Sequence, residues 1–139
     1  MSFLDEYGES DLRRERFFKT IVALFLLAIA IGLVYYIFFR AWAQQWQVRS
    51  FLDALEDSRY EEAYEYWGCS ISDPCRYYSY DAFLTDWGPE SEIGPVDSFE
   101  LGAWYEQRTG VIIQITINGQ PRNNLWVEKD SNQIGFSPY

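Results

Sequence analysis

The longest run of hydrophobic positions lies between Thr20 and Phe39 and contains 20 residues without a charged side chain. At a rise of about 1.5 Å per residue, a helix of this length extends about 30 Å, which is the thickness of the hydrocarbon core of a bilayer. Lys19 and Arg40 border the run on its two sides. The pattern therefore predicts one transmembrane helix over residues 20–39.

Aromatic residues stand at both ends of this run, as is typical of membrane–water interfaces. The candidate interface residues are Phe17 and Phe18 at the first end and Tyr35, Tyr36, Trp42 and Trp46 at the second. Two rival interpretations are a buried core helix and a cleaved signal peptide, because Ala41-Trp42-Ala43 has the form of a cleavage site. The run is longer than the apolar region of about 7–15 residues in signal peptides, and too apolar on all sides for a small domain to cover. We therefore favour a retained membrane anchor.

Basic residues are distributed unequally about the predicted membrane helix. Only Arg40 and Arg49 follow it closely, whereas four basic residues precede it: Arg13, Arg14, Arg16 and Lys19. Because basic flanks are retained on the cytoplasmic side, we expect residues 1–19 to form a cytoplasmic tail. Residues 40–139 would then lie outside the inner (cytoplasmic) membrane, in the periplasm or the extracellular space.

Two small residues, Ala28 and Gly32, are four positions apart in the middle of the run. Residues at this spacing share one helix face, and small side chains allow a second membrane helix to approach closely. We therefore take Ala28 and Gly32 as the candidate helix-packing residues.

A helical period of apolar positions follows the membrane segment. Val48, Phe51, Leu52 and Leu55 form one apolar stripe, which predicts an amphipathic helix. Neither Gly nor Pro occurs between residues 39 and 55, so this helix can continue from the membrane helix without a break. After an interruption at residues 57–59, a second helix is expected over residues 60–67, with its end at Gly68, and a third over residues 79–87.

After residue 97 the spacing of the apolar positions changes from a helical period to alternation. Four strands are predicted, at residues 98–106, 111–118, 125–129 and 133–136. Tight turns join the later strands, including Asn118-Gly119, so the sheet should be an antiparallel meander. Helices followed by a sheet predict an α+β domain in which about three helices pack on a curved four-stranded antiparallel sheet.

The charge of the chain is concentrated in its second part. The net charge is −10, and residues 41–139 contain 16 acidic and six basic residues, whereas residues 1–40 contain five of each. Such an acidic domain repels phosphate backbones, which excludes nucleic acid as a partner and leaves a basic soluble protein as a candidate. The chain has no histidine, the commonest metal ligand and the usual axial ligand of haem, and we expect no metal and no cofactor.

Two cysteines, Cys69 and Cys75, flank a short segment that contains Asp73-Pro74. An Asp-Pro turn can bring the two sulfurs together, and outside the cytoplasm an even pair of cysteines indicates a disulfide. We expect a structural disulfide between Cys69 and Cys75, with a stabilisation of about 2 kcal/mol because the closed loop is short.

Residues 45–137 resemble the NTF2-like superfamily in the order and type of their segments. The resemblance rests on the helix pair at residues 51–55 and 60–67, the third helix at residues 80–87, and the last three predicted strands. It implies a cone-shaped fold in which a curved sheet wraps a long helix, and it is closest to the membrane-anchored extracytoplasmic members. The last strand departs from the family pattern, because Gln133-Ile134 stands where a Trp before an aliphatic residue is usual.

These features favour a non-enzymatic, single-pass accessory subunit of a larger integral membrane protein complex, for example a photosynthetic or respiratory one. The first alternative is an extracytoplasmic domain that binds a ligand or docks a basic soluble partner. The second, suggested by the resemblance, is an NTF2-like enzyme with pocket residues among Tyr64, Tyr66, Asp81 and Tyr105. Nothing in the spacing of these four residues sets them apart from ordinary core and surface positions, so we predict no catalytic residue.

Overall fold

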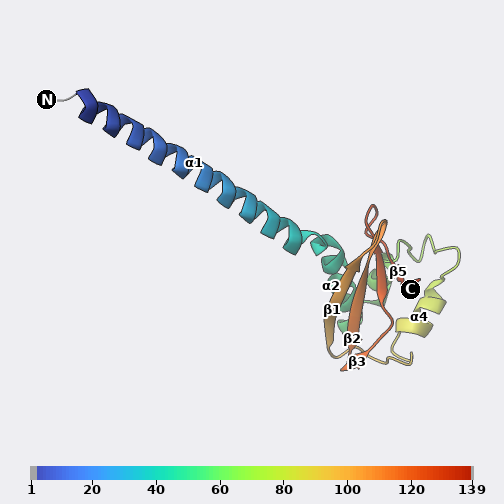
Figure 1. Ribbon diagram of the computed structural model, residues 1–139. Helices are drawn as coiled ribbons and strands as arrows, with labels where there is room; N and C mark the ends of the chain where they lie inside the picture. The colour runs from blue at the N-terminus through green and yellow to red at the C-terminus, as the bar shows by residue number, and fades with distance from the viewer. Residues whose placement is uncertain (1–2, 139) are drawn as a thin grey trace. The chain divides into compact units, whose positions relative to one another are not determined.

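The computed structural model describes residues 3–138, with side chains described from residue 10 onward. The chain divides into two compact units, Met1–Arg40 and Ala41–Tyr139. Figure 1 shows the first unit as a single helix and the second as helices packed with a sheet.

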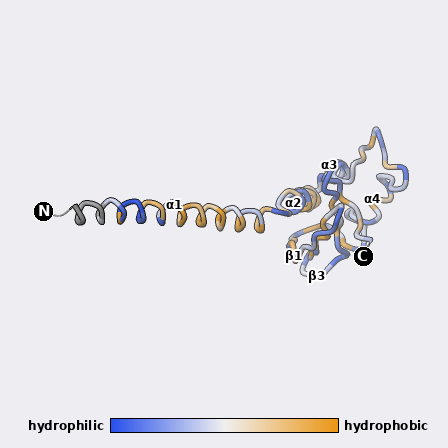
Figure 2. Tube along the Cα trace, turned by 45° about the horizontal axis from the view of Figure 1, so that its top comes forward, coloured by the Kyte–Doolittle hydropathy of each residue, from blue (hydrophilic) through white to orange (hydrophobic). Residues whose placement is uncertain are grey.

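The first unit consists of helix α1, Phe3–Phe39, which contains the predicted membrane segment in its second half. Figure 2 shows the hydrophobic residues of α1 following a more polar stretch, and Glu15 and Lys19 form an ion pair of 2.8 Å within that stretch. The apolar part is long enough to cross a membrane, and none of its most hydrophobic 18-residue window is buried.

The expected continuous helix from residue 39 to residue 55 is wrong. Helix α1 ends at Phe39, a turn follows at Arg40 and Ala41, and helix α2 spans Trp42–Glu56. Ala41 has φ −114° and ψ 19°, outside the α-helical region, and its side chain is fully buried in the core of the second unit. The interruption thus comes from tertiary packing of a residue with high helix propensity, which the local sequence does not reveal.

Helix α2 buries the predicted apolar stripe. Val48, Phe51, Leu52 and Leu55 are each at most 1% exposed. The helix ends where expected, because Ser58 adopts φ +58° and Arg59 donates its backbone N–H to the carbonyl of Ala54 at 2.7 Å. These contacts satisfy the last carbonyls of the helix in a Schellman arrangement, with Ser58 at the position usually taken by glycine.

Two shorter helices follow, α3 over Tyr60–Glu65 and α4 over Tyr80–Trp87. The expected helical extent to residue 67 is wrong, because α3 ends at Glu65 and residues 66–68 form turns, with Gly68 at φ +81°. Ser79 caps α4, since its hydroxyl accepts the backbone N–H of Ala82 at 3.2 Å.

The sheet is an antiparallel meander. Its strands are β1 (Phe99–Glu106), β2 (Gly110–Ile117), β3 (Gln120–Pro121), β4 (Leu125–Glu128) and β5 (Ile134–Phe136). The strand order is β1-β2-β4-β5, and β3 pairs with β2 across the Asn118-Gly119 turn, where both residues have positive φ. The two-residue strand β3 was not predicted, because it lies in a polar segment with Pro121.

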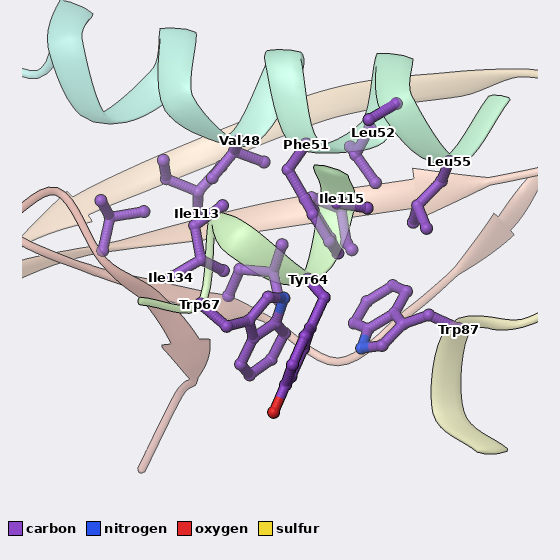
Figure 3. Close-up of a cluster of buried hydrophobic side chains, with 14 of the residues drawn as sticks. Val48, Phe51, Leu52, Leu55, Tyr64, Trp67, Trp87, Ile113, Ile115 and Ile134 are labelled. Carbon is purple, nitrogen blue, oxygen red and sulfur yellow. The ribbon is translucent and has the colours of Figure 1, made fainter. Parts of the chain in front are cut away.

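Helix α2 lies against the sheet, and the core fills the space between them and the two short helices. In Figure 3 the α2 stripe faces Ile113, Ile115 and Ile134 of the sheet, with the rings of Tyr64 and Trp67 beneath. The α+β prediction and the antiparallel sheet are confirmed.

Candidate functional site

The predicted interface aromatics are all exposed: Phe17, Phe18, Tyr35, Tyr36, Trp42 and Trp46. Within α1, the ring of Tyr35 stacks on that of Phe39 with centroids 4.5 Å apart. Within α2, the stacked rings of Trp42 and Trp46 have centroids 5.8 Å apart. The two tryptophans therefore lie on the opposite side of α2 from the buried stripe, as an amphipathic helix requires.

The predicted helix-packing residues lie on an open surface of α1. Ala28 and Gly32 are exposed, and a side-chain carbon added at Gly32 would meet no atom within 4 Å. Four-residue spacing places them one above the other on one face. The isolated helix thus leaves room for a second helix at this face.

Cys69 and Cys75 lie at disulfide distance, with Cα atoms 5.1 Å apart. The segment between them bends at residues 71–73, where the backbone N–H of Asp73 donates to the Ser70 hydroxyl at 3.0 Å and the backbone N–H of Ser70 donates to the Asp73 carbonyl at 3.0 Å. The bridge closes the loop at residues 69–75, and its sulfurs lie 3.3 Å and 3.7 Å from the carbonyl oxygen of Trp67.

The Tyr64 hydroxyl fixes this loop to the core. It donates to the carbonyl of Tyr78 at 2.5 Å and accepts the backbone N–H of Cys75 at 3.1 Å. The ring of Tyr64 is fully buried between those of Tyr80 and Phe83. Tyr64 was a candidate pocket residue, and its polar atom is instead occupied by two backbone groups.

The other candidate pocket residues do not gather around it. Tyr66 packs its ring edge on Phe51, with centroids 6.4 Å apart. Asp81 is exposed in the first turn of α4, and Tyr105 is 51% exposed on β1. The space between helices and sheet that a cone-shaped pocket would use is filled by aromatic rings (Figure 3).

The phenol of Tyr78 is an ionisable group of this region whose pKa is shifted upward. Burial raises the pKa of its phenol above the ordinary value, and the hydrogen bond that it donates to Asp86 at 2.7 Å raises the pKa further, because ionisation would place two negative charges together. The phenol is therefore held neutral as a donor that joins the disulfide loop to α4.

An open cleft of about 820 Å³ lies beside the end of α4. Its lining comes from α4, the loop at residues 88–98, the segment after β3, and β5. It contains the single basic residue Arg122 and three acidic residues, Asp86, Glu90 and Glu92. Sequence reasoning missed this cleft, because its residues are separated by up to 51 positions and none belongs to a motif.

No group of three or more Cys, Asp or Glu side chains among the described residues is placed to hold a metal ion. Comparison with protein-family models, with curated proteins and with solved structures gives no match.

Proposed function

We propose that the chain is a non-enzymatic, single-pass accessory subunit of a larger membrane protein complex. In this proposal α1 spans the inner membrane with its N-terminal end in the cytoplasm, and residues 41–139 form an NTF2-like domain on the outer side. The observation that carries it is the exposed apolar part of α1, joined to a domain that has its own complete core.

An apolar helix surface of this size requires apolar surroundings. The 18-residue window of α1 is entirely unburied, although exposed apolar surface in water carries a cost of about 25 cal/mol per Å². A bilayer removes this cost for every side chain around the helix. In the rival interpretation, a signal peptide, cleavage would remove the apolar helix and with it this cost. The disulfide is consistent with an anchor and with a signal peptide, since either places residues 41–139 in an oxidising compartment.

Ala28 and Gly32 support association in addition to anchoring. In lipid, apolar side chains gain little by leaving acyl chains for a neighbouring helix, so association depends on close backbone approach or polar contacts. The face that contains Ala28 and Gly32 permits such an approach. The outer domain supplies a second contact surface next to the membrane.

A structural role for the domain agrees with the use of its polar groups. The hydroxyl of Tyr64, a candidate pocket residue, is occupied by partners within the protein, and so is the hydroxyl of Tyr78. The acidic surface of residues 41–139 favours a second candidate function, docking of a basic soluble protein, through electrostatic steering.

Co-purification from native membranes in mild detergent tests the proposal. The tagged wild-type chain should bring with it a defined set of integral membrane proteins. Gly32→Leu should reduce their yield, because the added side chain holds the partner helix away, and leave insertion unchanged because Leu favours insertion.

Ala30→Leu is the matched control, since it adds similar bulk on the opposite side of α1. If Gly32→Leu co-purifies as well as Ala30→Leu, the packing face is wrong. If the wild type brings only basic soluble proteins, the docking function replaces the accessory-subunit function.

A further inference from the structure

Arg122 is held at the cleft beside α4 by its backbone. Its N–H donates to the carbonyl of Ile115 at 3.1 Å, which extends the hairpin of β2 and β3 by one contact. Its side-chain Nε is buried and has no hydrogen-bond partner among the described residues. Arg122 also lines the cleft, so the part of its guanidinium that faces the cleft, and not the buried Nε, can donate to a bound acceptor.

The acidic residues of the cleft do not neutralise Arg122. Asp86, Glu90 and Glu92 line the same cleft, yet the ion pairs among the described residues include none between these carboxylates and Arg122. Asp86 is already engaged, because it accepts the Tyr78 hydroxyl at 2.7 Å. One basic and three acidic residues give the cleft a net negative charge.

This charge pattern selects against simple ions. A plain anion at Arg122 would be repelled by the neighbouring carboxylates, and a plain cation at the carboxylates would leave the guanidinium without an acceptor. A ligand with a carboxylate and an ammonium group satisfies both sides. The size of the cleft, about 820 Å³, lies within the range of small-molecule sites, about 300–1,000 Å³.

One wall of the cleft is apolar. The rings of Trp87 and Phe136 are nearly parallel, with centroids 6.1 Å apart and an interplanar angle of 11°. Trp87 is 3% exposed and forms the fixed base, whereas Phe136 is 45% exposed and presents its ring to solvent, with Ile93 lining the same cleft. An apolar side chain placed against Phe136 would bury surface on both partners.

We propose that this cleft binds an amphipathic zwitterion of amino-acid or short-peptide size. The ligand carboxylate accepts hydrogen bonds from the Arg122 guanidinium, its ammonium group faces Glu90 and Glu92, and its apolar side chain lies against Phe136. The inference is independent of the membrane partner, since every lining residue belongs to the second unit.

Calorimetric titration of the full chain in detergent micelles tests this proposal, with the dipeptide Ala-Phe as the probe and protein-free micelles as the blank. Ala-Phe should bind, and both Ala-Phe amide and N-acetyl-Ala-Phe should bind about tenfold or more weakly, because each lacks one charge. These comparisons use the wild-type protein and do not depend on the folding of a variant.

Arg122→Gln should weaken Ala-Phe binding by about tenfold or more, and so should the double change Glu90→Gln, Glu92→Gln. The control is Arg108→Gln, an exposed change of the same charge in the turn between β1 and β2, outside the cleft, which should leave binding unchanged. Absence of binding at about 10 mM Ala-Phe, a free energy weaker than about 3 kcal/mol, overturns the proposal. Equal binding of either blocked dipeptide overturns it as well, because one of the two charges would then not be recognised.

Discussion

Replacement of Tyr64 by Phe removes one oxygen atom and keeps the buried ring. The ring contacts with Tyr80 and Phe83, at centroid distances of 5.4 Å and 5.3 Å, are retained. The hydrogen bonds to the carbonyl of Tyr78 and from the N–H of Cys75 are lost. The substitution therefore isolates the attachment of the disulfide loop to the core.

The expected loss of unfolding free energy follows from these two bonds. Each contributes a net of about 1 kcal/mol, and backbone groups left without a partner add to the loss, so Tyr64→Phe should cost about 2–3 kcal/mol. For a domain of about 100 residues, a change of about 1 kcal/mol in the unfolding free energy moves the thermal unfolding midpoint by about 4–8 °C. Tyr64→Phe should therefore lower this midpoint by at least about 8 °C.

Thermal unfolding followed by near-ultraviolet circular dichroism measures this decrease. The matched control is Tyr77→Phe, which removes the same atom from a side chain that is 88% exposed in the neighbouring segment. Its midpoint should stay within about 2–4 °C of the wild type, as surface changes usually cost less than about 0.5 kcal/mol. Equal midpoints for both variants would refute the idea that the Tyr64 hydroxyl holds the loop.

Two further changes test the sheet and the ionisation of Tyr78. Gly110→Ala should lower the unfolding free energy by about 2 kcal/mol or more, because the added carbon would overlap the ring of Trp126 in the adjacent strand β4. Denaturant titrations measure this loss, and a loss below about 0.5 kcal/mol would contradict the packing of Gly110 against Trp126. The raised pKa of the Tyr78 phenol contributes stability that is present below its ordinary value of 10.0 and is lost as the pH rises above that value, because the unfolded chain then releases a proton that the folded chain retains. Stability measured between about pH 9 and about pH 11 should therefore fall more steeply for the wild type than for Tyr78→Phe, and parallel curves would contradict it.

The elements that the sequence predicts correctly are those set by local pattern. The stripe from Val48 to Leu55 has the helical period, and a stripe with this period has to face a core wherever the helix lies. Asn118-Gly119 forms the expected turn because both residues tolerate positive φ. Ser79 begins α4 for an equally local reason, because its hydroxyl caps the first turn.

The features that the sequence does not reveal depend on distant contacts. Ala41 breaks a helix in a segment without Gly or Pro, because its side chain is buried in the core of the second unit. The two bonds of the Tyr64 hydroxyl join residues 11 and 14 positions away. In the sequence, Arg122 is one of six basic residues among residues 41–139 and nothing distinguishes it from the others. Only the fold shows that it lines a cleft together with Phe136.

The NTF2-like resemblance stays a proposal that rests on the order of the helices and strands. The meander and the helix that packs on it agree with the expected order of elements. The space between α2 and the sheet is filled by core side chains.

The most direct test of the proposed topology is the accessibility of single cysteines introduced on either side of α1. Ser131 lies in the exposed turn after β4 and Ser10 lies in the polar part of α1, and each is replaced by Cys in a separate variant. The native cysteines do not react, because they form a disulfide. A membrane-impermeant maleimide applied to intact spheroplasts should label Ser131→Cys and should label Ser10→Cys only after the membrane is opened. Labelling of Ser10→Cys in intact spheroplasts, or protection of Ser131→Cys, would contradict an outer domain held by a single membrane helix.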